Sequence, residues 1–311
     1  MPSTTLILDP LTLKGRELLS CSERLGELVA DWGYRHTDLD DEHQIADVSA
    51  GPVLVPPLEG PEDFAGAEVI VVASDGWSSR HEHLLAYLDE HPDTRLLDLG
   101  SCKHLRDITV PTAGGTAPHA GKLRVAHPAL YATSRVAEVL SHLGTVGGSL
   151  AVVDPASAFG REGVEILARQ AAQRVQGAQV EDRIHGHVLA FSTVAVESDE
   201  LQEDAGMLFP DLPLAVTRTL SGCFHGHLAH LSLRFEQRLE VDDVREALTQ
   251  ADGLVIQNFP LNLDSVPDHD AVIVTPPCCS PDGLQLALTM MADGLRFGGA
   301  LTAVEILESI L

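Results

Sequence analysis

The stretch Glu68–Ala73, which reads Glu-Val-Ile-Val-Val-Ala, is apolar at every position after the first. A continuous apolar run of this length is typical of a parallel strand that is buried on both faces of its sheet. On either side of this stretch, the sequence predicts strands at Thr4–Leu8, Val53–Val55 and Arg95–Leu99, an amphipathic helix at Gly15–Gly33 and a helix at His81–His91. Alternation of strands and helices predicts a parallel α/β sheet.

A loop rich in Gly, Pro and Ala at Val110–Lys122 marks a boundary. Beyond it, the sequence predicts helices at Leu130–Leu143, Arg161–Gln176 and Glu240–Thr249, and strands at Ser149–Val153, around Val188–Val196, and at Leu214–Leu220, Leu228–Glu236 and Gly253–Ile256. The last segment, Gly283–Leu311, is interpreted as one long apolar helical segment with an interruption near Gly298-Gly299.

The composition is strongly acidic, since 46 Asp and Glu against 20 Lys and Arg give a net charge of −26 over 311 residues. The chain is 44% hydrophobic, which is enough for a buried core in two domains or one large one. The negative charge argues against binding to nucleic acids or anionic membranes, because phosphates would be repelled. An acidic surface with few lysines fits a salt-rich cytoplasm, and GC-rich coding bias would deplete lysine equally well.

Features of secretion and membrane insertion are missing from the sequence as given. The start has no basic region before its short apolar run, and no stretch reaches the roughly 18 uncharged apolar residues of a membrane span. The five cysteines are odd in number and follow no CxxC spacing: Cys21, Cys102, Cys223, Cys278 and Cys279. Reduced cysteines of this kind indicate a soluble cytoplasmic protein.

Several short segments follow one another in an order that is typical of a known enzyme family. They are GRELL at 15–19, RLLDLGS at 95–101, DPASAFG at 154–160, Gly226-His227, and the C-terminal run Leu286–Val304 with its DGLRFGGALTAV ending. These segments resemble those of aspartate-semialdehyde dehydrogenases, whose matching motifs are G-x-x-G-x-x-G-R-E-L-L, vIDnS, Q-x-x-S-G-A-G, G-H-S and D-N-L-x-K-G-A-A-x-N-A-V.

The resemblance implies two domains and a homodimer. Residues 1–126 and 286–311 would form a Rossmann-type parallel-sheet domain like those that bind nucleotides, and residues 127–285 an α+β catalytic and dimerisation domain. In that family a cysteine thiolate attacks the aldehyde, hydride passes to NADP, and phosphate resolves the thioester.

The position of the family's nucleophile is changed in this chain. The family reads N-P-N-C just before a helix, where the helix N-terminus lowers the pKa of the thiol. Here the equivalent stretch is Ala126–Thr133, so that Leu130 stands at the cysteine position, and no cysteine lies between Cys102 and Cys223. Leucine cannot form a thiohemiacetal, which predicts that the covalent step is lost.

The nucleotide loop is changed as well. The family's G-x-x-G-x-x-G aligns with Asp9–Gly15, so only Gly15 is kept, and Asp9 and Thr12 replace the other glycines. A carboxylate at Asp9 about 4 Å from a phosphate charge would cost roughly 4 kcal/mol at an effective dielectric of about 20. The remaining candidates for cofactor contacts are Gly15, Thr12 and Ser79. We therefore expect no cofactor, and NADP only if the family activity survives.

The substrate positions match the family only in part. Asp154 replaces the motif's glutamine and would repel a carboxylate substrate, while Ser157 matches its serine. Leu220 stands where the family has arginine, and Arg218 is a candidate substitute two residues away. His227 is the one outright match to a catalytic residue.

The sequence favours a catalytically degenerate paralogue, either empty or repurposed for binding a small molecule or a protein. Two alternatives stay open: a divergent NADP-dependent semialdehyde dehydrogenase, and another enzyme that uses Cys223 with His227, or a metal, in the same cleft. Cys223, His225 and His227 alternate as metal ligands on one strand face would. A chain with 15 histidines also produces such clusters by chance, so His227 is interpreted first as structural.

Overall fold

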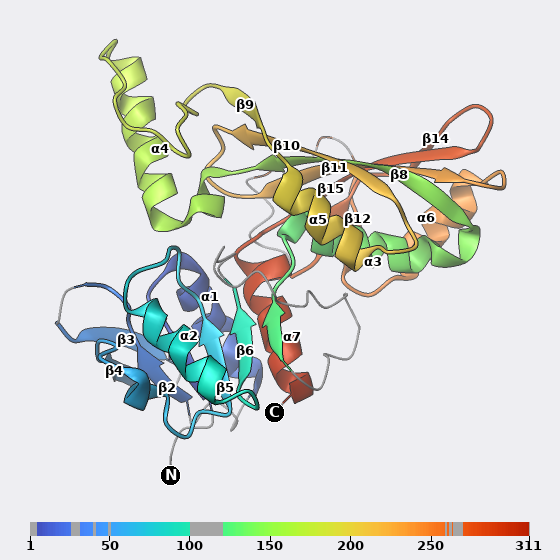
Figure 1. Ribbon diagram of the computed structural model, residues 1–311. Coiled ribbons are helices and arrows are strands. Elements are labelled where there is room, and N and C mark those ends of the chain that lie inside the picture. The colour runs from blue at the N-terminus through green and yellow to red at the C-terminus, as the bar shows by residue number, and fades with distance from the viewer. Residues whose placement is uncertain are drawn as a thin grey trace. The chain divides into compact units, whose positions relative to one another are not determined.

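The computed structural model describes residues 5–25, 32–39, 42–48, 51–99, 121–258, 260, 263 and 270–310. The chain divides into two compact units (Figure 1). Unit 1 comprises residues 1–125 and 299–311, and unit 2 comprises residues 126–298. The expectation of a parallel α/β domain followed by an α+β domain is confirmed. No helix among the described residues is long and apolar enough to cross a bilayer.

Unit 1 is built on a five-stranded sheet in the order β2-β1-β5-β6-β7, in which every pair is parallel. Its strands are β1 (Thr5–Leu8), β2 (Trp32–Arg35), β5 (Val69–Val72), β6 (Arg95–Asp98) and β7 (Lys122–Arg124). The central strand β5 is buried at all four positions, as the continuous apolar run predicted.

Helices cover this sheet, and a small hairpin lies beside it (Figure 1). The further elements of unit 1 are α1 (Leu13–Cys21), the hairpin of β3 (Gln44–Val48) and β4 (Gly51–Val55), η2 (Pro61–Phe64), α2 (His81–Glu90) and α7 (Leu301–Ile310). Ile70 and Val72 of β5 share a buried cluster with Leu84 and Leu88 of α2. The helices α1 and α7 contact each other.

The predicted helix Gly15–Gly33 is wrong at its end, and its residues 26–31 lie outside the described part of the chain. The helix α1 ends at Cys21, and Trp32–Arg35 is the edge strand β2, which pairs with β1. Trp32 and Tyr34 are buried whereas Gly33 and Arg35 are half-buried, which is the two-residue period of a strand. Aromatic residues favour such a position.

Unit 2 contains a mixed eight-stranded sheet in the order β12-β13-β15-β11-β8-β10-β9, with β14 also paired to β15. Its strands are β8 (Thr145–Asp154), β9 (Thr193–Val196), β10 (Leu214–Ser221), β11 (His227–Phe235), β12 (Leu254–Ile256), β13 (Val272–Val274), β14 (Cys278–Cys279) and β15 (Gln285–Ala292). Its helical elements are α3 (Pro128–Leu140), η3 (Ser141–Leu143), η4 (Ala156–Phe159), α4 (Gly160–Val175), α5 (Asp199–Leu208) and α6 (Val241–Gln250), and the π-helical turn η6 (Arg296–Ala300) lies at the boundary with unit 1.

The long helical segment predicted at Gly283–Leu311 is also wrong in its first half. Gln285–Ala292 is the strand β15, which pairs antiparallel with β11 and β13. Its even-numbered side chains Leu286, Leu288 and Met290 are buried, whereas Gln285 and Ala287 are exposed. The strand therefore belongs to the sheet of unit 2, and the boundary between the units falls at residue 299 rather than at residue 286.

Three helices pack on one face of this sheet (Figure 1). The helix α3 contacts β11 and β15, α5 contacts β10, and α6 contacts β12. Among the described residues, no helix covers the opposite face, which presents mainly short side chains from β8, β10, β11 and β15. Unit 2 thus has a covered face and an open face.

Candidate functional site

The strand order of unit 2 brings the candidate residues of the second half of the chain together. Asp154 is the last residue of β8, and His227 is the first residue of the antiparallel neighbour β11. On the other side of β8, the parallel strand β10 places Arg218 in register with Val152. His127 is the N-cap of α3, immediately before Pro128.

Asp154 is the centre of this group and is fully buried. The Arg218 Nε donates a hydrogen bond of 2.7 Å to its Oδ2. His127 Nε2 lies 3.2 Å, and His227 Nε2 3.7 Å, from its other oxygen, Oδ1. Burial by itself raises the pKa of the Asp154 carboxyl, but the positive charges of His127, His227 and Arg218 outweigh it and hold this pKa well below its usual range.

No motif in the sequence singles out His127 as a site residue. Its ring lies edge-on to the ring of His227, with the centroids 5.3 Å apart. Its Nδ1 accepts a hydrogen bond of 3.2 Å from the amide of Ala129 and so caps α3. One feature of the sequence could have pointed to His127. It is a titratable residue directly before the proline that precedes a predicted helix, three residues before the position of the family's nucleophile.

Gly294 makes room for the ring of His227. A Cβ atom at this position would lie 2.2 Å from both Cε1 and Nδ1 of His227, and 2.8 Å from Cγ of Pro128. Any side chain would displace the ring, because real Cβ atoms do not approach so closely. The family motif quoted above has asparagine where this chain has Gly294.

Leu130 occupies the first turn of α3, three residues after His127. Its amide donates a hydrogen bond of 2.8 Å to the carbonyl of His127, and its side chain is fully buried. In the part of the chain that the structure describes, the group of possible metal ligands comprises His127, Asp154 and His227. Cys223 and His225 are not part of this group.

Ser157, the remaining candidate for substrate contacts, is buried in η4 after Asp154. Its amide donates a hydrogen bond of 3.0 Å to the carbonyl of Phe224, and the amide of Ala156 donates one of 2.8 Å to the carbonyl of Cys223. These bonds tie the loop after β8 to the loop before β11.

The nucleotide-loop candidates lie in unit 1, where Asp9 differs from the expectation. Its carboxylate is turned into the unit and accepts hydrogen bonds of 2.6 Å from both the amide and the hydroxyl of Thr37, and a further one from the hydroxyl of Ser74. The hydroxyl of Ser74 also lies 2.8 Å from Nε2 of His81. The sequence-based expectation that Asp9 repels a phosphate required its carboxylate to point towards the ligand. Because the carboxylate instead binds Thr37 and Ser74, that expectation is not supported.

Thr12 and Gly15 lie together where α1 begins. The hydroxyl of Thr12 accepts a hydrogen bond of 3.0 Å from the amide of Gly15 and donates one of 2.6 Å to the carbonyl of Ala73, after β5. Ser79 is exposed in the turn before α2, whose N-cap is Arg80. Thr12 thus caps α1 with its own side chain.

No model of a known protein family matches the chain. Among curated proteins, it is 28% identical over 174 residues to a protein named USG-1 protein homolog from Azotobacter vinelandii. It is 27% identical over 182 residues to an aspartate-semialdehyde dehydrogenase from Mycolicibacterium smegmatis. These alignments cover 50% and 49% of this chain, and the chain spans about half the length of each relative, 52% in both cases.

Solved structures extend the likeness to the whole chain. Aspartate semialdehyde dehydrogenase II from Vibrio cholerae, complexed with ASA, matches with a TM-score of 0.85 and 16% identity over 100% of this chain and 98% of that one. A probable aspartate-semialdehyde dehydrogenase from Pseudomonas aeruginosa matches with a TM-score of 0.85 and 18% identity, covering 99% and 98% of the two chains. The resemblance to aspartate-semialdehyde dehydrogenases is therefore confirmed, in sequence over about half of the chain and in fold over all of it.

Proposed function

We propose that this chain does not oxidise aspartate semialdehyde and that its site in unit 2 serves for binding. The observation that carries the proposal is Leu130, which is fully buried in the first turn of α3, where the family's motif has cysteine. A hydrocarbon side chain offers no nucleophile, and loss of a covalent nucleophile costs several orders of magnitude in turnover.

The surroundings of Asp154 support the same proposal. A carboxylate stands where the family motif has a neutral glutamine, and it is already paired with the Arg218 guanidinium at 2.7 Å. The cation nearest to the family's arginine position is thus engaged by the chain's own side chain. A substrate carboxylate would have to compete with Asp154 for Arg218 and would meet its negative charge.

The experiment is formation of NADPH from aspartate semialdehyde, NADP and phosphate by the wild-type protein. We expect no turnover above the rate without protein. The alternative, a divergent dehydrogenase of the same family, predicts turnover within the ordinary enzyme range, above about 1 per second. Titration with NADPH alone tests cofactor binding separately from turnover. We expect no saturable binding of NADPH in the micromolar range.

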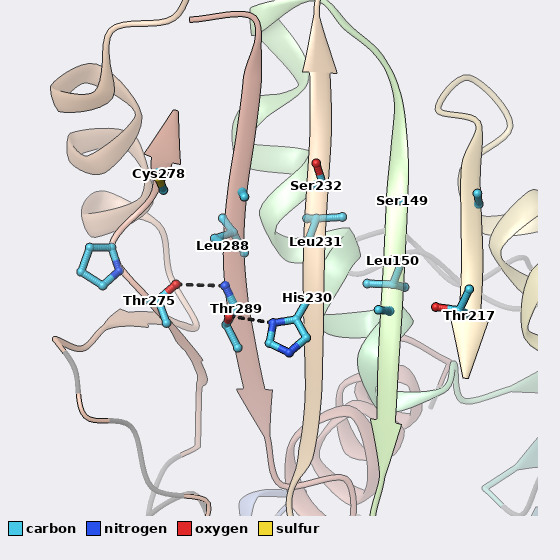
Figure 2. A pocket seen from close by; sticks show the side chains of 14 residues that line it. Ser149, Leu150, Thr217, His230, Leu231, Ser232, Thr275, Cys278, Leu288 and Thr289 are labelled. Carbon is cyan, nitrogen blue, oxygen red and sulfur yellow. Dashed lines mark hydrogen bonds between the residues drawn. The ribbon is translucent and has the colours of Figure 1, made fainter. Parts of the chain in front are cut away.

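We further propose that the chain forms a homodimer through the open face of the sheet in unit 2. Figure 2 shows this face, which is hollowed to about 530 Å³ and lined by residues of β8, β10, β11, β14 and β15. The side chains that reach outward are small or weakly polar, among them Ser149, Thr217, His230 and Ala287. Two copies related by a twofold axis would meet on this same face.

The polarity of the open face is suited to contact with a second copy of the chain. His230 Nδ1 lies 2.9 Å from the hydroxyl of Thr289 (Figure 2). The backbone amide of Thr289 donates a hydrogen bond of 2.9 Å to the hydroxyl of Thr275. These contacts pair polar groups of the face with one another. None of the lining residues carries a formal charge at pH 7 with histidine neutral, whereas the chain as a whole carries −26. A charge-poor surface on so acidic a protein favours burial against a second copy.

A further inference from the structure

We propose that His127, Asp154 and His227 bind a divalent transition-metal ion of the zinc type. The three side chains come from the start of α3, the end of β8 and the start of β11. Each offers one ligand atom, and these atoms all lie within 4.8 Å of one another. The inference goes beyond the proposed loss of dehydrogenase activity, because it assigns a ligand to the site.

The distances between the donor atoms suit one ion. Two ligand atoms at about 2.1 Å from a tetrahedral zinc ion lie about 3.4 Å apart. The Oδ1 atom of Asp154 is 3.2 Å from Nε2 of His127 and 3.7 Å from Nε2 of His227. Both imidazoles thus present the same ring nitrogen to the same carboxylate oxygen, at separations on either side of the ideal value.

The orientation of these atoms is a second, independent observation. Oδ1 of Asp154 and Nε2 of His127 are both buried, yet neither makes a hydrogen bond to another described residue, although they are only 3.2 Å apart. A buried carboxylate oxygen without a hydrogen bond is costly and rare, and a bound ion is a recognised explanation. An ion between the two atoms would satisfy both.

Arg218 supplies the outer support that a metal-binding carboxylate needs. Its Nε holds Oδ2 of Asp154 at 2.7 Å, which leaves Oδ1 directed at the two imidazoles. Ligating carboxylates are commonly held by such a partner, which fixes their orientation. Gly294 has the matching role for His227, because any Cβ at that position would displace the ring.

Binding has one identifiable cost. A ligating Nε2 must be unprotonated, so the proton of a neutral His127 moves to Nδ1, which now accepts the Ala129 amide at 3.2 Å. The helix cap is lost or rearranged when the ion binds. This is one weak hydrogen bond against three bonds to the metal.

The donor set decides the kind of ion. Two imidazoles with one carboxylate suit zinc, cobalt and related ions, whereas magnesium and calcium prefer sites built of oxygen alone. Three protein ligands leave a fourth position for water or a small ligand. The site therefore differs from the set of Cys223, His225 and His227 considered from the sequence, with which it shares only His227.

The test is titration of the full chain with Co²⁺ after a chelator has removed bound metal, followed by visible absorption. Cobalt takes the geometry that zinc takes, and its absorption in a four-coordinate site is intense. We expect saturation at about one ion per chain and displacement by Zn²⁺, which binds such sites more tightly. Absence of a four-coordinate spectrum at saturating Co²⁺ would overturn the proposal.

Variants assign the site. His127→Ala should weaken binding by at least about 100-fold, since loss of an outer-shell partner alone costs 10–100-fold. His225→Ala is the matched control, because His225 lies close along the chain but outside the group, and its affinity should equal that of the wild type. Equal affinity of the wild type and His127→Ala would overturn the proposal.

A second measurement covers the case in which His127→Ala fails to fold. X-ray absorption of the wild type loaded with zinc should show two imidazoles in the first shell, and a shell of oxygen atoms alone would overturn the proposal. Gly294→Ala keeps all three ligands and should still weaken binding, by about 10–100-fold, through the displaced ring of His227. Metal binding is measured by Co²⁺ titration and semialdehyde oxidation by NADPH formation, so either proposal can fail without the other.

Discussion

At the scale of single residues, Gly15 is the one glycine of the family's nucleotide-loop motif that this chain has, and its packing explains why a glycine is needed there. A Cβ atom at this position would lie 2.5 Å from the carbonyl oxygen of Asp9 and 2.6 Å from the carbonyl carbon of Pro10. Both are backbone atoms, which do not move aside as the end of a side chain does. The glycine thus allows the first turn of α1 to pack against the loop after β1, whether or not a nucleotide binds.

Gly15→Ala is therefore expected to destabilise the fold by about 1–3 kcal/mol, the usual cost of overpacking. Gly76→Ala is the matched control, because a Cβ there meets nothing within 4 Å. Urea unfolding of the two variants and the wild type measures the difference. A Gly15→Ala variant as stable as Gly76→Ala would mean that the loop is not packed as described.

Part of the site was predicted from the motifs that resemble those of the family. His227, Asp154 and Arg218 were singled out from the sequence, and the structure brings all three together. His127 was missed, because its contact with Asp154 joins residues on α3 and β8 through the fold rather than through a local motif. The inward turn of Asp9 was missed for the same reason, since Thr37 and Ser74 lie on other loops.

At the scale of elements, an ion pair links β2 to η2. Arg35 Nε and Nη2 each lie 2.9 Å from Oδ1 of Asp63. Oδ2 of Asp63 accepts hydrogen bonds from the amides of Glu59, at 2.8 Å, and Gly60, at 3.3 Å. Burial raises the pKa of the Asp63 carboxyl, but the Glu59 amide and the Arg35 guanidinium together lower it below the ordinary value.

Because the folded-state pKa of Asp63 is lowered, its charge stabilises the fold above the unfolded pKa of about 3.9. This contribution is lost as the pH falls through the folded-state pKa. Asp63→Asn should lower the free energy of unfolding by about 2 kcal/mol at neutral pH. The gap to the wild type should narrow below about pH 4, in urea unfolding measured at pH 7 and pH 3.

Asp47→Asn, on the exposed edge of the β3–β4 hairpin, is the control and should leave stability close to that of the wild type at both pH values. A gap between Asp63→Asn and the wild type that stays constant or widens in acid would contradict the assigned role of the carboxylate.

The elements differ in how well the sequence predicted them. The run Glu68–Ala73 was correctly predicted to contain a buried strand, because an apolar segment this short that is buried on all sides is typical of a strand in a parallel sheet. The strand β15 was not, since the Leu, Ala and Met residues of Gln285–Ala292 are good helix formers. Pairing with β11 and β13 overrides that local preference, and only the alternation of buried and exposed side chains reveals it.

At the scale of the whole molecule, the open face of unit 2 predicts the oligomeric state. Sedimentation at micromolar concentration should give a dimer of the 33.2 kDa chain, with an interface on the order of 2,000 Å². Ala287→Glu should shift the protein towards monomer, because a twofold axis sets the new charges close together on the shared face. Gln250→Glu, an exposed position on α6, adds the same charge and should remain dimeric.

The two outcomes that would contradict this assembly are distinct. A wild-type protein that sediments at 33.2 kDa would show that no stable dimer forms. Dimers that survive Ala287→Glu unchanged would show that the copies meet elsewhere.

The net charge of −26 makes a separate prediction about salt. Self-repulsion destabilises the compact state, and added salt relieves it as the Debye length falls from about 30 Å at 0.01 M to about 3 Å at 1 M. The melting temperature should rise with KCl over this range. A flat or falling curve would show that the acidic surface does not limit stability.

The central claim is that the chain has lost semialdehyde oxidation through changes at more than one position. The most direct measurement is NADPH formation from aspartate semialdehyde, NADP and phosphate by the wild type and by Leu130→Cys, side by side. We expect neither protein to oxidise the semialdehyde. The Leu130→Cys variant would regain a thiol, but Asp9 and Thr12 would still replace the loop glycines and Asp154 would still stand at the substrate position. Turnover by Leu130→Cys alone would show that only the nucleophile had been lost, and wild-type turnover above about 1 per second would contradict the account.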